Sequence, residues 1–388
     1  MNVPKLRFKE FNEEWQKINL KNVFEYFSTN SLSRDQLSDS GMIKNIHYGD
    51  IHRKYSSIVN VENDVETYIK DINYNNKYEL CKDADLVFAD ASEDYDGIGK
   101  VIELDNVKCN TVSGLHTILV RDKENIFAPM FKGYYFNSPT IHNQIRILAN
   151  GFKVYGISKD SINKLNINIP TKKEQYKIAN TLFLLDKKIE LQTKKIEDLK
   201  LFTKILETQY IFNNHNEYSK KRIDEIFSIK AGGDIEKSNV SSVKTTSFCY
   251  PIYSNNLEMN GLFGYSNIYK IEEDSITVTG RGDIGKAIKR NGKYYPIVRL
   301  LVLIPKINVN LIYMQEAINN LKLIQESTGV PQLTAPQISK YKILYPTIDI
   351  QNRYGKILDL LQRKIEYEII KRKKIKELKK GLMQNMFV

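Results

Sequence analysis

The chain has 388 residues, of which 41% are hydrophobic and 27% charged, so it can fill two or three globular domains and is not disordered. Its net charge of +12 favours a polyanionic partner such as nucleic acid. No apolar run approaches the ~20 residues that span a bilayer, and the N-terminus lacks a signal-peptide core. We therefore expect no membrane partner and a cytoplasmic location. The scattered cysteines, which predict neither a zinc site nor a disulfide framework, are Cys81, Cys109 and Cys249.

Residues 1–169 are predicted to form a first domain of mixed α/β structure. Phe8, Phe11 and Trp15 stand among charged residues near the start, and we interpret them as part of the domain core. Short β-rich runs follow, separated by Gly, Asn and Asp turn signals. These runs cover residues 86–89, 99–104 and 116–120, and helices are expected over 129–135 and 142–148.

An internal repeat follows this domain, because residues 170–206 match residues 346–382 without a gap. Each copy begins with a Pro-Thr pair, continues with a glutamine, Gln175 or Gln351, and then shows helical apolar periodicity. A repeat of this kind determines the architecture, since each copy must fold in the same way.

The block between the copies again mixes strand and helix patterns. Strands are expected over 275–279 and 300–304, and a helix over 310–323. We therefore predict a mixed α/β protein with pseudo-twofold tandem organisation. Its predicted segments are a first α/β domain (1–169), a long helix (170–213), a second α/β domain (214–345) and a second long helix (346–388).

Both long helices carry the heptad pattern of a coiled coil, with apolar residues at alternating steps of four and three. In the second helix Glu368 and Arg372 interrupt this seam. Each helix is the obvious partner of the other, and the pseudo-twofold repeat makes the pair antiparallel; homodimerisation through either helix is the alternative. The predicted coiled-coil residues are Ile178, Leu182, Leu185, Ile189, Leu199, Leu358, Leu361, Ile365, Ile375 and Leu378.

A glycine-rich segment, residues 280–287, matches both the GxGxxG and the GxxxxGK phosphate-binding patterns. Both patterns require a helix after the loop, whereas the following residues read as strand, turn and strand. The first domain carries a partial copy at residues 96–101, with the same Ile-Gly-Lys turn. We interpret these turns as suited to close approach to a DNA backbone, or as plain hairpins. No Pro-Pro methyltransferase loop, metal-ligand spacing or recognisable catalytic triad is present, so the sequence argues against self-contained catalysis.

The whole chain resembles the specificity subunit of type I restriction–modification systems. The motifs that carry this resemblance are the opening Pro4-Lys5-Leu6-Arg7-Phe8 with Phe11 and Trp15, the Pro-to-Gln lead-ins of both helices, and the segments 46–51, 250–255 and 279–286. The resemblance implies two target-recognition domains, each reading one half of a bipartite DNA site. It also implies an antiparallel coiled coil that sets the spacer between the half-sites.

The expected partners also follow from this resemblance. They are double-stranded DNA, two modification subunits that dock on the helices and bring S-adenosylmethionine, and restriction subunits that bring ATP and Mg²⁺. This chain would hold no cofactor itself. The residues expected to contact DNA are Tyr48, His52, Arg53, Lys100, Tyr253, Asn255, Asn256, Arg281, Lys286, Lys289 and Arg290.

Two other classes of function stay open from the sequence. One is a coiled-coil scaffold that binds proteins and not DNA. The other is a catalytic subunit that uses the glycine loop. Neither the recognised bases nor the spacer length can be predicted, because recognition loops vary freely on one scaffold.

Overall fold

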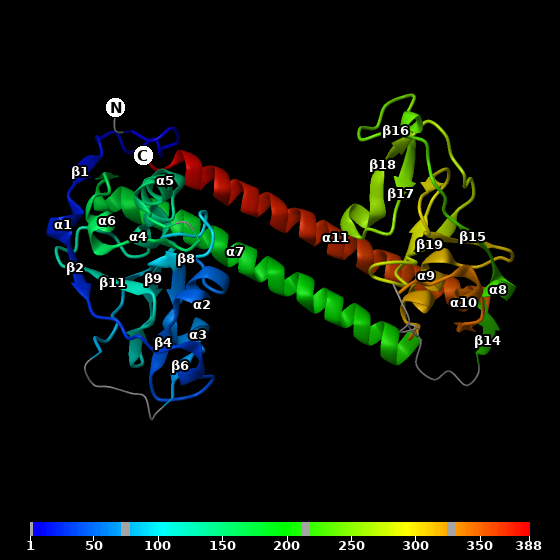
Figure 1. The fold of residues 1–388 in the computed structure, drawn as a ribbon, viewed down its shortest axis with the longest axis horizontal. Helices are drawn as coiled ribbons and strands as arrows, with labels where there is room; N and C mark the ends of the chain where they lie inside the picture. The colour runs from blue at the N-terminus through cyan, green and yellow to red at the C-terminus, as the bar shows by residue number, and fades with distance from the viewer. Residues whose placement is uncertain (1–2, 71–77, 152, 212–217, 324–330) are drawn as a thin grey trace. The chain divides into compact units, whose positions relative to one another are not determined.

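The computed structural model describes residues 3–70, 78–151, 153–211, 218–323 and 331–388. It divides into two compact units of mixed α/β structure (Figure 1). Unit 1 comprises Met1–Thr193 with Lys371–Val388, and unit 2 comprises Lys194–Ile370. The boundary predicted between residues 213 and 214 lies outside the described residues.

The main sheet of unit 1 has the strand order β2-β11-β7-β9-β5, antiparallel except where β9 meets β5. Its strands are β2 (Phe24–Phe27), β5 (Ile58–Asn60), β7 (Leu86–Ala89), β9 (Val101–Asp105) and β11 (Thr117–Asp122). The strands predicted at 86–89, 99–104 and 116–120 are therefore confirmed as β7, β9 and β11. Their residues are buried in nearly continuous runs, which places these strands at the centre of the domain with both faces covered.

A second sheet of unit 1 has the order β10-β4-β6-β3, in which β10 and β4 are parallel. Its strands are β3 (Leu37–Ser38), β4 (Lys44–Ile46), β6 (Tyr68–Ile69) and β10 (Thr111–Ser113). A short pair joins β8 (Ala91–Ser92) to β12 (Tyr155–Gly156). The small helices α2 (Tyr48–Arg53) and α3 (Val61–Asp64) follow β4 and β5.

The core of unit 1 is aromatic and includes the end of the chain. Every residue of α4 (Phe131–Phe136) is buried, and α5 (Pro139–Leu148) follows it. Trp15 is 2% exposed, with its ring 6.5 Å from that of Tyr135, which confirms its predicted core role. Phe387 packs on the same group, with its ring 5.9 Å from Phe131. Residues from both chain termini therefore complete this unit (Figure 1).

Unit 2 repeats this plan. Its main sheet has the antiparallel order β15-β22-β19-β20, which corresponds to β2-β11-β7-β9. Its second sheet, β16-β18-β17-β21, again contains one parallel pair, β17 with β21. The strands are β15 (Phe227–Ala231), β16 (Val240–Ser241), β17 (Tyr250–Tyr253), β18 (Leu262–Ser266), β19 (Ser275–Val278), β20 (Ala287–Arg290), β21 (Tyr295–Pro296) and β22 (Leu301–Pro305). Helix α9 (Leu311–Asn319) covers β20 and β19.

The two units also begin and end alike. Strand β1 (Gln16–Ile18) pairs with β13 (Ile167–Ile169), and β14 (Ser219–Arg222) pairs with β23 (Lys342–Tyr345). A short helix follows the first strand of each pair and another precedes the second. These helices are α1 (Leu20–Val23), α6 (Lys159–Asn163), α8 (Ile223–Ile226) and α10 (Ala335–Ser339). Each pair thus ties the entry of a domain to its exit, directly before a long helix.

The repeated stretch becomes the long helices α7 (Lys172–Ile205) and α11 (Ile348–Asn385). A π-helical turn, Leu206–Ile211, continues α7. The repeated glutamines explain the lead-in motif, because both are buried at the helix start. Gln175 Nε2 donates to the Pro170 carbonyl, and Gln351 Nε2 donates to the Pro346 carbonyl, each at 2.9 Å.

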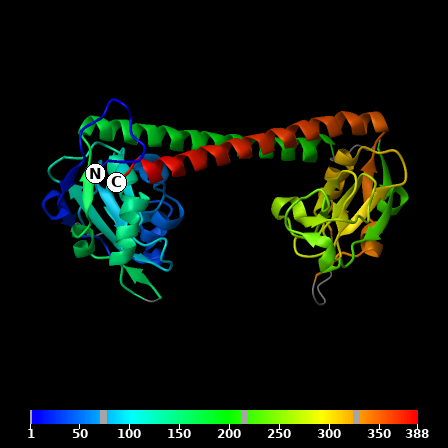
Figure 2. The ribbon, with the colours of Figure 1, turned by 90° about the horizontal axis from the view of Figure 1, so that it is seen from above.

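Within unit 1 the two long helices run in opposite directions. Lys379 Nζ lies 2.6 Å from Asp186 Oδ1, and Arg372 Nη1 donates to Thr193 Oγ1 at 3.5 Å. The end of α11 therefore lies beside the start of α7 (Figures 1 and 2). The backbone N–H of Leu6 donates to the Asn385 carbonyl at 2.8 Å and ties the N-terminal segment to the end of α11.

In unit 2 the pairing continues through a buried acid. Glu368, which interrupts the predicted seam, is 1% exposed and lies 2.7 Å from Lys195 Nζ of α7 and 3.2 Å from Lys364 Nζ. A charge-assisted contact replaces an apolar layer at this position, because the lysines neutralise the carboxylate while their own side chains stay half exposed.

Burial supports most of the predicted seam. Leu378 is a correction, because its side chain is 54% exposed and the helix places Lys379, four residues after Ile375, on the seam instead. The seam residues that are buried or partly buried are Ile178, Leu182, Leu185, Ile189, Leu199, Leu358, Leu361, Ile365 and Ile375.

Candidate nucleic-acid interface

The topology brings together the same loops in each unit. In unit 1 the chain leaves β4 beside the end of the parallel strand β10, and the turn after β10 leads into β11. Thr117, at the start of β11, pairs with Ala89, at the end of β7. The loops after β4, β7 and β10 therefore meet at one edge of the unit.

Unit 2 places the corresponding loops in the same way. The chain leaves β17 beside β21, and the turn after β21 leads into β22. Leu301, at the start of β22, pairs with Val278, at the end of β19. The glycine segment after β19 therefore meets the loops after β17 and β21. Of the seven residues expected to contact DNA from unit 2, five lie on or beside these loops, and the other two, Lys289 and Arg290, lie in β20.

In unit 1 helix α2 presents the predicted residues Tyr48, His52 and Arg53. A buried carboxylate anchors this helix, because Asp50 accepts hydrogen bonds from both terminal nitrogens of Arg34 at 2.7 and 2.8 Å. Burial disfavours the charged form of Asp50 and would raise its pKa. The hydrogen bonds and positive charge of Arg34 outweigh this effect of burial and hold the pKa of that carboxyl below its ordinary value. The helix is therefore fixed in place while Arg53 stays exposed.

An aromatic and imidazole cluster forms around Tyr48. Its ring lies 4.7 Å from His47, 6.2 Å from His52 and 5.2 Å from His116. His47 Nδ1 accepts from the Gly49 N–H and caps α2, and burial followed by the nearby charge of Arg34 lowers the pKa of His47. The lowered pKa favours the neutral form of His47, so this imidazole stacks on Tyr48 as an uncharged ring.

The predicted Lys100 joins this cluster from the glycine turn after β7. Its Nζ donates to the His52 carbonyl at 3.2 Å, and burial lowers the pKa of the ammonium. Lys100 therefore supports α2 as well as lying near the cluster. The same loop is acidic, with Asp94 and Asp96 close in sequence, so the unit 1 edge is of mixed charge.

In unit 2 Asn255 holds the loops together. Its side-chain oxygen accepts from the Gly280 N–H at 2.8 Å, and its amide nitrogen donates to the Val298 carbonyl at 2.6 Å. One side chain after β17 thereby fixes both the glycine segment and the turn before β22. Its neighbour Asn256 is exposed on the same loop.

Arg290 lies behind this edge rather than on it. It is 5% exposed, its Nε donates to Thr277 Oγ1 at 2.9 Å, and its Nη2 donates to the Asn260 carbonyl at 2.7 Å. The guanidinium also stacks 3.7 Å from the ring centroid of Tyr253, and burial lowers its pKa. The structure therefore brings Arg290 and Tyr253 together, with Arg290 as a support for Tyr253 and not as a free cation.

The remaining cations of unit 2 that were expected to contact DNA lie on the glycine segment and in the following strand β20. Lys286 is exposed, and Arg281 is partly exposed beside the left-handed Gly282. Lys289 lies in β20, where its backbone N–H donates to Gln315, so its side chain leaves from the sheet rather than from a loop.

Two residues on the turns before β11 and β22 lie at these loop edges but were not among the residues expected to contact DNA. His116 and Arg299 occupy these turns, both with positive φ, at 54° and 63°. No local pattern marks a non-glycine residue for this conformation, which explains the omission. The available signal was positional, since His116 begins the strand predicted at 116–120 and Arg299 directly precedes the strand predicted at 300–304.

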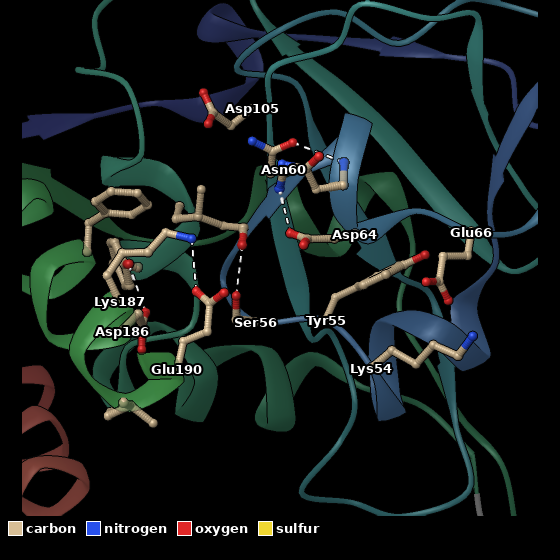
Figure 3. A pocket seen from close by; sticks show the side chains of 15 residues that line it. Lys54, Tyr55, Ser56, Asn60, Asp64, Glu66, Asp105, Asp186, Lys187 and Glu190 are labelled. Atoms are coloured by element: carbon tan, nitrogen blue, oxygen red, sulfur yellow. Dashed lines mark hydrogen bonds and ion pairs between the residues drawn. The ribbon is translucent and has the colours of Figure 1, made fainter. Parts of the chain in front are cut away.

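A cavity of about 560 Å³ lies elsewhere in unit 1, between the α2–β5 segment and α7 (Figure 3). Its labelled carboxylates are Asp64, Glu66, Asp105, Asp186 and Glu190, against the amines of Lys54 and Lys187. Lys187 points to Glu190 at 2.9 Å in this view and is engaged there. The lining is therefore unsuited to phosphate and lies apart from the loop edge.

Neither a metal cluster nor a membrane span emerges from the described part of the chain. Among these residues, no group of His, Cys, Asp or Glu is arranged to hold a metal ion. Within the same ranges, no helix is long and apolar enough to cross a bilayer.

The related proteins and solved structures found by comparison are specificity subunits of type I restriction–modification systems. A type I specificity subunit of Mycoplasma pneumoniae is 28% identical over 211 residues, which are 53% of this chain and 57% of that protein. The chain spans about half the length of the curated relatives it matches first. The crystal structure of the S subunit of a type I restriction–modification system from M. genitalium has the same fold, with a TM-score of 0.69 at 17% identity over 100% of this chain and 99% of that one.

A second solved structure, from a study of complex assembly and conformational transition of the type I system, matches with a TM-score of 0.56 at 13% identity, covering 95% of this chain and 96% of that one. The family model for the type I restriction modification DNA specificity domain matches twice, over residues 12–201 and 215–380. These matches follow the repeat seen in the two units. The chain therefore belongs to the family of type I restriction modification DNA specificity domains and carries two copies of that domain.

Proposed function

We propose that this chain is the non-catalytic specificity subunit of a type I restriction–modification complex, in which each unit reads one half of a bipartite DNA target. The observation that carries the proposal is the duplicated loop edge. Equivalent loops meet at equivalent strand ends in both units, and both edges carry aromatic and cationic side chains, to which unit 2 adds the amides of Asn255 and Asn256. Such groups read base edges and phosphates, and a net charge of +12 favours a polyanion.

The chemistry of the side chains at each edge indicates which of them contact phosphates and which contact bases. Lys286 and Arg53, both exposed, supply phosphate contacts, which position the protein and give salt-dependent affinity. Asn255 and Tyr253 shape the unit 2 edge from behind. Base choice then belongs to side chains that reach outward from the fixed loops.

The test is modified-base sequencing of DNA from cells that express this chain with its modification subunit. We expect one interrupted motif, methylated at adenine on both strands. A complex that forms but leaves no motif, and whose stability does not depend on salt, would instead support a protein-binding scaffold. Nucleotide-dependent stabilisation of the purified chain would support the glycine-loop alternative.

The antiparallel helices are proposed to set the spacer. Removing seven residues around Gln192 from α7 and seven around Arg372 from α11 preserves the heptad seam and shortens the pair by about 10 Å. We expect the spacer to change by roughly three base pairs, since each base pair rises 3.4 Å, while both half-sites stay the same. A change in the half-site sequences would contradict the proposal that the helices set the spacer length.

The proposed partners are two modification subunits, which would bring S-adenosylmethionine, and restriction subunits, which would bring ATP and Mg²⁺. A repeated set of exposed apolar residues supports the docking of two equal partners. On the face of each helix outside the seam, Leu184 and Leu191 of α7 match Leu360 and Tyr367 of α11 in the repeat. All four are more than half exposed, at 58%, 68%, 58% and 59%. Exposed apolar groups in such a row are typical of interfaces.

The docking proposal predicts a separate effect at each site. Leu191→Glu and Tyr367→Glu should each reduce the complex from two modification subunits to one, measured by native mass spectrometry. Lys200→Glu and Lys376→Glu are matched controls, because both positions are exposed and equivalent in the repeat. Equal binding by all four variants would refute docking on this face.

A further inference from the structure

The turns that enter β11 and β22 share an uncommon backbone conformation. His116 has φ 54°, and Arg299 has φ 63° after Val298 with φ 21°. A side chain at positive φ crowds the backbone, so such positions usually carry glycine. Both units therefore keep a long polar side chain exactly where glycine would relieve strain, and non-glycine residues in this region cluster at functional sites.

Backbone contacts hold each turn against the neighbouring loop. In unit 1 the Asp90 N–H donates to the His116 carbonyl at 3.0 Å, and the Gly114 N–H donates to the Ile46 carbonyl at 2.8 Å. The turn is thereby fixed between the loops after β7 and β4. The strain at His116 is thus held by the surroundings.

In unit 2 the corresponding contacts come from different groups. The Val298 carbonyl accepts from the Asn255 amide at 2.6 Å, and the Val298 N–H donates to the Gly233 carbonyl at 3.2 Å. A Cβ built on Gly280 would lie 2.5 Å from the Arg299 carbonyl, so the turn and the glycine segment touch. Different residues therefore produce the same arrangement in both units.

The side chains of these turns point from the fixed backbone toward open space. His116 is 49% exposed in its side chain, and its Nδ1 lies 3.3 Å from Asp90 Oδ1. A partner at Nδ1 leaves Nε2 for another group. Arg299 is exposed, and its Nη1 donates to Gln332 Oε1 at 2.9 Å, which leaves other guanidinium donors for a ligand.

We propose that His116 and Arg299 are equivalent specificity-determining residues, one for each half-site, a proposal that rests on the DNA-reading function above. The guanidinium fork of Arg299 matches the O6 and N7 acceptors of guanine in the major groove. The imidazole of His116, beside Tyr48, offers a single polar nitrogen to a base edge. The strained turn holds each side chain in one place, which base discrimination requires.

The test uses the full chain in complex with its modification subunit. Arg299→Gly and His116→Gly remove the side chains and also relieve the positive φ, so neither should lower the unfolding temperature. Arg299→Lys keeps the charge but loses the fork. Lys306→Ala and Lys123→Ala are matched controls, because both exposed lysines directly follow β22 and β11, at the opposite ends from the turns.

We expect Arg299→Gly to accept other bases at one position of one half-site, with methylation of singly mismatched sites rising about ten-fold or more. His116→Gly should relax the other half-site, Arg299→Lys should relax the same position as Arg299→Gly, and the controls should keep the motif. An unchanged motif in both glycine variants would overturn the inference. So would equal weakening of both half-sites. If the wild-type complex methylates no interrupted motif, the proposed function fails first, and this inference fails with it.

Discussion

The repeated glutamines Gln175 and Gln351 are expected to stabilise the two units to different extents. Gln175 is 1% exposed; its Oε1 accepts from Ala128 N–H at 2.8 Å, and its Nε2 donates to the carbonyls of Pro170 and Ile126 at 2.9 and 3.3 Å. Gln351 is fully buried and has one donor contact fewer among the described hydrogen bonds, since Oε1 accepts from Asn310 N–H at 3.1 Å and Nε2 donates to Pro346.

Truncation to alanine removes these hydrogen bonds and a packed methylene. Each bond contributes about 1 kcal/mol net, and a buried methylene about 0.8 kcal/mol. Gln175→Ala should therefore destabilise unit 1 by about 4 kcal/mol, and Gln351→Ala should destabilise unit 2 by about 3 kcal/mol. Gln175→Glu, which keeps the shape but cannot donate to the Pro170 carbonyl, should also destabilise unit 1.

Hydrogen exchange under mild denaturant is the suitable assay, because a chain of two units does not unfold in one step. Loss of protection should be confined to the unit that carries the substitution. Gln362→Ala, at an exposed position of α11, is the matched control and should change stability by less than about 0.5 kcal/mol. A loss below about 1 kcal/mol for Gln175→Ala, or equal losses in both units, would refute this account of the motif.

Three further predictions concern buried charge. Glu368→Leu should raise the stability of the helix pair by about 1 kcal/mol, measured by thermal unfolding. The reason is that an apolar layer replaces a buried acid whose partner Lys195 stays 51% exposed and hydrated. A lower melting temperature would contradict this prediction. Burial lowers the pKa of His47, so the unfolded state binds the proton more tightly, and unit 1 should lose stability as the pH falls below about 6.5. His47→Gln should flatten that loss in urea titrations at pH 5 to 7. Burial and the nearby Glu316 raise the pKa of Glu207 to about 7, so unit 2 should lose stability as the pH rises from about 4.5 to 7. Glu207→Gln should stabilise unit 2 at pH 8 by about 1 kcal/mol after solvent screening, and no gain would count against this carboxyl.

The sequence predicted the elements that local periodicity encodes. The strands at 86–89 and 300–304 were predicted because each is a short apolar run, and both long helices were predicted because apolar residues repeat on one face. Leu378 was misplaced for the same reason. An apolar side chain three residues after Ile375 imitates a heptad step, whereas the folded helix places Lys379 there and supplies Asp186 as its partner.

The sequence predicted which segments form the candidate site, but it did not predict which side chains of those segments face outward. The motifs located α2, the loop after β17 and the glycine segment, but the direction of each side chain depends on residues far away in sequence. Arg290 is buried because Thr277 and Asn260 bind it, and no pattern near Arg290 reveals this. The turns of His116 and Arg299 depend on contacts between three loops, which are equally invisible in a single sequence.

The packing of Phe387 against the core of unit 1 has a consequence for synthesis on the ribosome. Residues 1–193 emerge first, yet the site that Phe387 and Met386 fill stays empty until these two residues have been translated. At about 5–20 residues per second, this delay is roughly 10–40 s. During that time the nascent first domain exposes an apolar surface beside Phe131 and Tyr135, where chaperones can bind. The domain made first is therefore completed only after unit 2 has been translated, and loss of Met386 and Phe387 would yield a protein whose defect lies in its first domain.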